Sequence, residues 1–233
     1  MGRNSADEII TIDGPAGAGK STVSKLLAKR LGYVYLDTGA MYRAVAVLAQ
    51  KEGIQPEDET ALEKLCRHLD ILFQESGADQ KIFCQGEDVT ERIRDPQIGW
   101  LASNVSMRRS VRQAMVNLQR KIGEKGKVVA EGRDTGTVVF PQAKYKFFLI
   151  ADPQERARRR YRELKAKGVD IIIEEVKEEM EKRDAQDSSR ELAPLRPAKD
   201  AKCIDSTNLT TEEVIEEIIK AINERERSNR ALL

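Results

Sequence analysis

The chain has 233 residues, 40% of them hydrophobic and 34% charged, which suits one α/β domain of ordinary size with a small inserted lobe. Lys and Arg total 40 against 39 Asp and Glu, so the chain lacks the basic surplus that is typical of nucleic-acid or membrane-surface binding. No window approaches the roughly 20 apolar residues of a membrane span, and the first eight residues are polar, so we expect a cytoplasmic protein. A single histidine, His68, argues against a histidine metal site or triad, and three widely spaced cysteines predict buried or partly buried free thiols.

Strands and helices alternate over the first fifty residues. A β-branched run at 9–12 predicts a buried strand that leads into a glycine-rich loop. Apolar residues at a spacing of three to four predict a helix over 20–31, closed by Gly32. A strand at 33–36 and a helix at 40–51 follow, and this order predicts a parallel sheet with right-handed crossovers.

The pattern changes in the second quarter of the chain. Three short strands with no helix between them, at 69–73, 81–85 and 87–90, predict an antiparallel insertion over about 63–97. Two of them are joined through a Ser76–Gly77 turn. Further elements are predicted at 98–105, 111–122, 154–167 and 174–185 (helices) and at 128–130, 146–151 and 202–204 (strands). We expect an irregular loop at 188–197 and a final helix capped by Thr211.

A phosphate-binding loop is the strongest motif. The segment GPAGAGKS at 14–21 matches GxxxxGK[ST] in full, between a predicted strand and a predicted helix. Its glycines let successive N–H groups point inward around an anion, and the helix N-terminus adds its positive dipole end. Lys20 is expected to reach the β/γ oxygens, Ser21 to ligand Mg²⁺ and Thr22 to contact a phosphate oxygen. The predicted ATP-binding residues here are Gly14, Pro15, Ala16, Gly17, Ala18, Gly19, Lys20, Ser21 and Thr22.

This motif alone fits GTPases, ATPases and small-molecule kinases. The NKxD and DxxG motifs of GTPases, the LSGGQ segment of transporter ATPases and the protein-kinase motifs are missing. Arginines are abundant instead, and the predicted helix 154–167 carries Arg156, Arg158, Arg159, Arg160 and Arg162. They form either a solvated helix face or a lid that closes over transferring phosphates, whose oxygens match the planar guanidinium.

Several segments together resemble one family. They are GPAGAGKST at 14–22, LDTGAMYR at 36–43, GEDVT at 86–90, EGRDTGTVVFP at 131–141, KRDAQDSSRELAPL at 182–195 and DST at 205–207. The sequence resembles the bacterial cytidylate kinases, which are P-loop nucleoside monophosphate kinases, over about 9–222. The resemblance implies a five-stranded parallel sheet flanked by helices, a three-stranded antiparallel patch in a monophosphate-binding lobe, and a short lid. It also implies transfer of the γ-phosphoryl group of ATP to CMP or dCMP with Mg²⁺, giving ADP and CDP or dCDP.

The same resemblance implies a division of the chain and a set of site residues. The core would comprise 1–36, 113–154 and 191–233, the monophosphate-binding lobe 37–112, and the lid region 155–190, and we expect a monomer. The acceptor phosphate would be held by Thr38, Arg43 and Arg133, the cytosine edge by Ser103, Arg112 and Asp134, and the sugar or phosphates by Arg183, Asp187 and Arg190. Ser206 and Thr207 would lie near adenine, and Glu131 would face Mg²⁺ through water. The transferring group would be stabilised by Lys20, Arg133, Arg159 and Arg183.

Each of these residues also has a structural interpretation. Thr38 could be the N-cap of its helix, Ser103 an incidental small residue, Arg112 a surface arginine, and Asp134 a partner of Arg133 or the cap of a turn. A surface salt-bridge group could account for Arg183, Asp187 and Arg190, and Tyr42 and Trp100 are expected to be packing aromatics. For the whole chain the alternatives are another small-molecule P-loop kinase and a non-catalytic nucleotide sensor.

Overall fold

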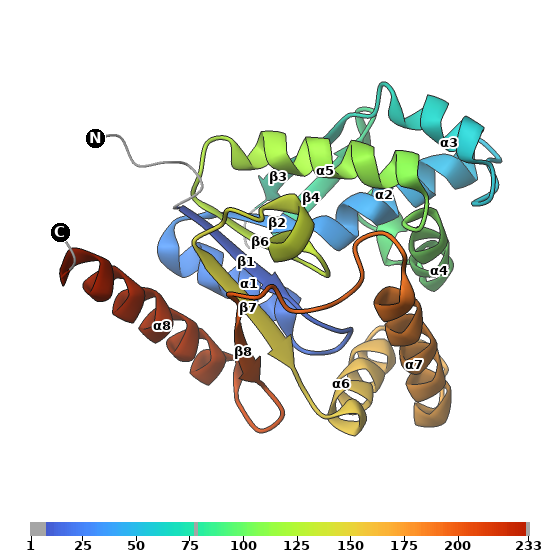
Figure 1. Ribbon diagram of the computed structural model, residues 1–233. Coiled ribbons are helices and arrows are strands. Elements are labelled where there is room, and N and C mark those ends of the chain that lie inside the picture. Colours follow the sequence, from blue (N-terminus) through green and yellow to red (C-terminus); the bar gives the residue numbers. More distant parts are fainter. Residues whose placement is uncertain (1–7, 77–78, 232–233) are drawn as a thin grey trace. The chain divides into compact units, whose positions relative to one another are not determined.

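The computed structural model describes residues 8–76 and 79–231 and divides them into two compact units (Figure 1). The first unit consists of the residues up to 36 and those from 123 onward, and the second consists of 37–122. The sequence-based lobe boundary at residue 112 lies inside the helix Arg109–Gly123, and the second unit continues through almost all of that helix. Residues 1–7, which were assigned as a polar N-terminus, and Gly77 of the predicted turn lie outside the described residues.

A five-stranded sheet forms the centre of the first unit, in the order β2-β6-β1-β7-β8. The strands are β1 (Ile9–Asp13), β2 (Val34–Asp37), β6 (Val128–Gly132), β7 (Tyr145–Ile150) and β8 (Lys202–Asp205). β1 runs parallel to β6, with Ile9 opposite Val128, and parallel to β7, with Ile10 opposite Tyr145. The predicted five-stranded parallel sheet is confirmed, and parallel strands bring the chain segments that follow them to one edge.

Helices cover this sheet because their apolar faces match its buried strands. The helices of the unit are α1 (Lys20–Leu31), the π-helical turn η3 (Thr135–Val139), α6 (Pro153–Ala166), α7 (Ile173–Ser189) and α8 (Thr211–Ala231). α1 and α8 pack on one face, where Leu27, Ile215 and Ile218 meet Ile12 and Leu149 in a fully buried cluster. Gly32 ends α1 in the left-handed conformation, as predicted. α7 continues to Ser189, so the irregular segment expected at 188–197 begins at Arg190.

The second unit combines helices with a small antiparallel sheet. Its elements are α2 (Thr38–Lys51), α3 (Glu59–Cys66), β3 (Ile71–Ser76), β4 (Asp79–Cys84), β5 (Glu87–Asp88), the 3-10 turn η2 (Arg92–Arg94), α4 (Pro96–Val105) and α5 (Arg109–Gly123). β3, β4 and β5 pair antiparallel in chain order, which confirms the predicted three-stranded patch. α2 packs against α4 and β4, and it supplies a row of buried apolar residues from Met41 to Ala49.

Helix α3 was not predicted, and two helix starts differ from the sequence-based expectation. Asp37, rather than Thr38, caps α2, because its carboxylate accepts a hydrogen bond from Ala40 N at 2.8 Å. At α8 the cap is Thr210 rather than Thr211. Thr210 Oγ1 accepts from Glu213 N at 3.3 Å, while the Glu213 carboxylate accepts from Thr210 N at 2.8 Å.

Two further expectations about packing were wrong. Trp100 is 68% exposed and does not pack in a core, because the buried face of α4 is formed by Ile98, Ala102 and Val105. Cys203 is exposed on β8, whereas Cys84 is buried and Cys66 partly buried. The three thiols are free, as expected, and burial raises the pKa of both Cys66 and Cys84 to about 11.

Among the described helices, none has the length and apolar character needed to cross a membrane.

Candidate nucleotide-binding site

The phosphate loop lies between β1 and α1, where a buried strand enters a helix N-terminus. Gly14 has φ +148°, and a Cβ there would lie 2.1 Å from the carbonyl oxygen of Leu149 on the neighbouring strand β7. Only glycine fits that position, so the sheet itself sets the path of the loop. Lys20 opens α1 and is 6% exposed, and its Nζ donates to the carbonyl oxygen of Pro15 at 2.7 Å.

The buried environment of Lys20 disfavours the protonated form of its amine. Burial is the main cause that lowers its pKa from 10.5 to about 7, and the positive charges of Arg133 and Arg183 lower it further. The carboxylates of Glu131 and Asp13 act in the opposite direction. Arg133 and Arg183, which were predicted to act with Lys20, are therefore within its electrostatic reach, and an arriving polyphosphate would favour the charged form of the amine.

Asp13, the last residue of β1, joins this strand to the segment that carries Arg133 and Asp134. Its buried carboxylate accepts hydrogen bonds from Thr135 N (2.9 Å), Thr135 Oγ1 (2.7 Å) and Gly136 N (2.8 Å). Burial raises the pKa of Asp13 to about 6, although the hydrogen bonds from Gly136 and Thr135 oppose that shift. Asp13 thus fixes the start of η3 relative to the base of the phosphate loop.

Arg133 pairs with a buried carboxylate of α7. Its Nε donates to Asp187 Oδ2 at 2.7 Å, and Arg190 Nη1 lies 3.7 Å from Asp187 Oδ1. Burial alone would raise the pKa of Asp187, but the charges of Arg133, Arg190 and Arg183 lower it below its usual value. The side chains of Asp187 and Arg190 are 7% and 6% exposed, so the interpretation as a surface salt-bridge group is wrong for this pair.

The arginines of α6 differ in their partners. Arg158 and Arg160 pair with glutamates of their own helix near its surface. Arg159 also pairs with Glu155 of its own helix, at 3.3 Å, but in addition it donates to the carbonyl oxygens of Ser206 (2.7 Å) and Thr207 (3.1 Å) and to Ser206 Oγ (3.2 Å). Ser206 Oγ in turn lies 3.1 Å from the carbonyl oxygen of Ala18. The loop predicted to lie near adenine is thereby connected to both the phosphate loop and α6.

The predicted site residues of the second unit lie on three helices. Thr38 is buried and Arg43 half-buried on α2, and Ser103 is half-buried on α4, where its carbonyl oxygen accepts from Ser106 Oγ at 2.7 Å. Arg112 on α5 is 5% exposed, so the alternative of a surface arginine is wrong. Its Nη1 donates to Ser106 O at 3.2 Å, and its guanidinium lies 5.7 Å from the centre of the Tyr42 ring.

The Glu131 carboxylate and the Ser21 hydroxyl would suit a magnesium ion that binds together with a nucleotide. Glu131 is buried in β6 and accepts a hydrogen bond from the Tyr35 hydroxyl, and Ser21 is exposed at the start of α1. No group of three or more His, Cys, Asp or Glu residues that could hold a metal occurs in the described part of the chain. Mg²⁺ commonly binds through one or two protein oxygens together with substrate phosphates and waters, and a hydroxyl with one carboxylate suits that mode.

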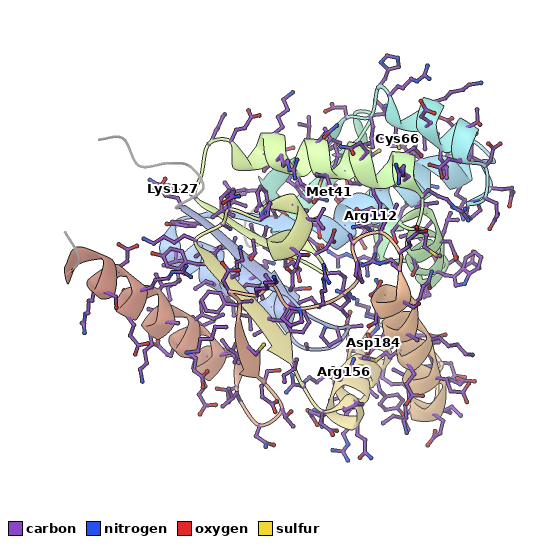
Figure 2. All side chains as sticks on the ribbon, in the orientation of Figure 1. Met41, Cys66, Arg112, Lys127, Arg156 and Asp184 are labelled. Carbon is purple, nitrogen blue, oxygen red and sulfur yellow. The ribbon has the colours of Figure 1, made fainter. Side chains whose placement is uncertain are left out.

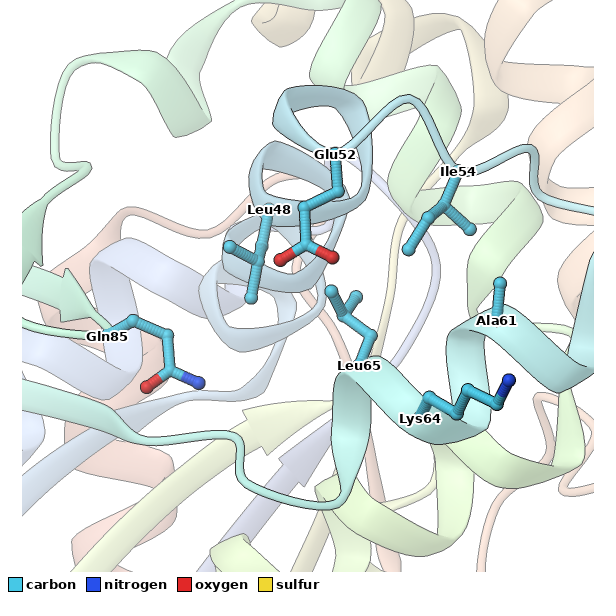
Figure 3. A pocket seen from close by; sticks show the side chains of 7 residues that line it. All are labelled: Leu48, Glu52, Ile54, Ala61, Lys64, Leu65 and Gln85. Atoms are coloured by element: carbon cyan, nitrogen blue, oxygen red, sulfur yellow. The ribbon is translucent and has the colours of Figure 1, made fainter.

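A shallow pocket within the second unit does not coincide with these residues. It is lined by Leu48, Glu52, Ile54, Ala61, Lys64, Leu65 and Gln85 (Figure 3). None of the predicted nucleotide-binding residues lines it, and its two opposite charges are on exposed side chains. The pocket is therefore a surface depression between α2, α3 and the end of β4.

Comparison with known proteins decides the family. The family model described as cytidylate kinase matches residues 10–224. The chain belongs to the cytidylate kinase family. Curated cytidylate kinases from a Geobacter species and from Geobacter sulfurreducens are 54% and 51% identical, over 93% and 94% of this chain and the same shares of theirs. The predicted family is thus confirmed. The crystal structure of an uncharacterized protein from Eubacterium ventriosum has a similar fold, with a TM-score of 0.50 and 15% identity over 92% of this chain and 98% of that one.

Three residues that contact the phosphate loop or the segment after β6 were not predicted as site residues: Asp13, and Arg156 and Asp184, which form an ion pair beside Ala16 of the loop. Asp13 was noted only as the end of a strand, Arg156 only as a member of the arginine cluster, and Asp184 not at all. A charged residue at the end of a buried strand, such as Asp13, is a sequence signal from which a site residue could have been predicted. The sequence has no comparable signal for Arg156 and Asp184, because their burial depends on how α6 and α7 pack.

Proposed function

We propose that this member of the cytidylate kinase family transfers the γ-phosphoryl group of MgATP to the phosphate of CMP or dCMP, forming ADP and CDP or dCDP. The observation that carries the proposal is the charge cluster beside the phosphate loop. Buried Lys20 lies within the electrostatic reach of Arg133 and Arg183, and Arg133 is held by buried Asp187. Such a concentration of positive charge suits a reaction that brings two phosphate groups together.

On the donor side, residues 14–22 would hold the ATP phosphates. The N–H groups of the loop and the N-terminus of α1 would bind the β-phosphate, and Lys20 would move from Pro15 O to the β/γ oxygens. Ser206 and Thr207 would border the adenine, supported by Arg159. Ser21, and Glu131 through water, would hold Mg²⁺, which when bound neutralises part of the phosphate charge.

On the acceptor side, Thr38, Arg43 and Arg133 would bind the CMP phosphate. Ser103, Arg112 and Asp134 would bind the cytosine edge, in which the exocyclic amine is a donor that uracil lacks. Asp187 would accept hydrogen bonds from the sugar hydroxyls, and Arg183 and Arg190 would contact phosphate.

The chemistry requires alignment more than proton transfer. A phosphate monoester has a second pKa near 6, so the acceptor is largely a dianion at neutral pH and attacks without a general base. The P–O bond from the γ-phosphorus to the β,γ-bridging oxygen breaks as the acceptor oxygen bonds to that phosphorus, and the negative charge of the transferring group is spread over its oxygens. Lys20, Arg133, Arg183 and Arg159 would stabilise that charge.

ADP release, measured with MgATP against CMP, dCMP, UMP, AMP, GMP and dTMP, tests this proposal. We expect CMP and dCMP to be the preferred acceptors, and Lys20→Ala to abolish most of the turnover with either. Preference for another monophosphate would contradict the roles given to Ser103, Arg112 and Asp134. Nucleotide binding without turnover on any of the six would favour a nucleotide sensor.

A further inference from the structure

Helices α6 and α7 pack directly against the phosphate loop. Their common core of Ala157, Leu164, Val176 and Met180 also contacts Ala16 of the loop. A Cβ added to Gly17 would lie 2.8 Å from Met180 Cε and 2.9 Å from the carbonyl oxygen of Arg156. Because no space separates the loop from these helices, the position of the loop depends on theirs.

One ion pair binds both backbone polar groups of Ala16. Arg156 Nη1 donates to Ala16 O at 3.0 Å and also to a carboxylate oxygen of Asp184, while Asp184 Oδ1 lies 3.4 Å from Ala16 N. Arg156 Nε additionally donates to Ala151 O at 3.2 Å, which connects the pair to the end of β7. Figure 2 shows Arg156 on α6 and Asp184 on α7. Their side chains are only 10% and 20% exposed, so water screens the two charges weakly.

Neighbouring residues of α7 contact Arg133 or are proposed to contact phosphate. Asp187 is three positions after Asp184 and holds Arg133, and Arg183 directly precedes Asp184. Two carboxylates one helical turn apart therefore connect α7 to Ala16 of the donor loop and to Arg133. A change at Asp184 would shift the loop relative to Arg133 and Arg183, even though neither arginine is altered.

We propose that Arg156 and Asp184 are positioning residues for phosphoryl transfer. Their ion pair fixes the phosphate loop in register with α7, so that the γ-phosphate of bound ATP faces Arg133 and Arg183 in line with the acceptor. This inference rests on the proposed function. Neither residue needs to touch a substrate. A neutral residue at 184 would leave the buried Arg156 guanidinium without its counter-charge and weaken the hold on Ala16.

Steady-state kinetics of Asp184→Asn and Arg156→Lys test the inference, with rates normalised to folded protein by circular dichroism and measured well below the unfolding temperature. We expect kcat at saturating MgATP and CMP to fall about tenfold or more in each variant, because misplacement on the order of 1 Å has effects of this size. The KM for CMP should change by less than about threefold. In the double variant the losses should not add, because both changes break the same pair.

Arg158→Lys is the matched control, since Arg158 is on the same helix, is 54% exposed and pairs only at 3.6 Å with Glu155 among the described contacts. Its kcat should remain within about twofold of the wild-type value. A lowered unfolding temperature with unchanged kcat in Asp184→Asn would overturn the inference, because the pair would then serve stability alone. If Asp184→Asn does not fold, an unchanged kcat in Arg156→Lys has the same meaning. The kcat comparison is made on whichever monophosphate the wild-type protein phosphorylates, so an unexpected acceptor contradicts the proposed function without deciding the role of this pair.

Discussion

Binding of MgATP at pH 8 is expected to take up close to one proton from the solvent, and Lys20 is the reason. Burial and the neighbouring charges of Arg133 and Arg183 lower its pKa to about 7, so about nine in ten ligand-free molecules carry a neutral amine at pH 8. A phosphate oxygen about 4 Å from Nζ contributes about 4 kcal/mol at an effective dielectric constant of about 20. One pKa unit corresponds to about 1.4 kcal/mol, so bound ATP would raise the pKa of Lys20 by about three units and restore its charge.

Calorimetric titration of the protein with MgATP in buffers of different ionisation enthalpy measures this uptake directly. We expect about 0.9 proton per ATP at pH 8 and about 0.5 at pH 7. ATP itself contributes little at pH 8, because its terminal phosphate is already ionised. Lys20→Arg keeps the positive charge at every pH and should show almost no uptake at pH 8. An uptake near zero for the wild-type protein, or an equal uptake in the variant, would refute the reasoning.

Two stability measurements test other parts of the structure. The folded-state pKa of Asp13, about 6, lies above its unfolded value of 3.8, so the stability that this group contributes is present below pH 3.8 and is lost as the pH rises through 6. In urea unfolding, the free energy of unfolding of the wild-type protein minus that of Asp13→Asn should therefore fall between pH 4 and pH 6 and then level off. A rise of this value over the same range would contradict the assigned shift. Thr210→Ala should lower the free energy of unfolding by about 1 kcal/mol, because it removes the N-cap of α8. Thr211→Ala should have a much smaller effect, and the reverse order would restore Thr211 as the cap.

The sequence predicted the sheet and the phosphate loop because their signals are local. A β-branched strand, a glycine-rich loop and an amphipathic helix follow one another from residue 9 to 31, and each agrees with the next. Helix α3 was missed because it is short and has only two buried apolar residues, Leu62 and Leu65, in an otherwise polar segment. Its one clear signal is Asp58, which caps the helix by accepting from Ala61 N at 2.9 Å.

The helix caps show the limit of reading adjacent residues. Asp37 and Thr38 are both able to cap α2, and Thr210 and Thr211 are both able to cap α8. Which of the two residues caps the helix depends on where the preceding strand or turn ends, and the fold determines that position. In the same way, Arg156 and Arg158 are alike in the sequence, but only Arg156 points toward the phosphate loop and α7. Residue type and helical period alone do not distinguish a buried guanidinium from an exposed one before the partner helix is placed.

The conformation of the phosphate loop has a consequence for the entropy of nucleotide binding. Gly14, Gly17 and Gly19 have positive φ angles, and the loop is held by contacts with strand β7 and with helices α6 and α7. Glycines lose more backbone freedom on ordering than other residues do. Here the backbone entropy of these glycines is lost when the protein folds, so the nucleotide binds to a loop that is already ordered. Binding of the triphosphate should therefore require little ordering of this backbone, and most of the structural adjustment around Lys20 should be confined to its side chain.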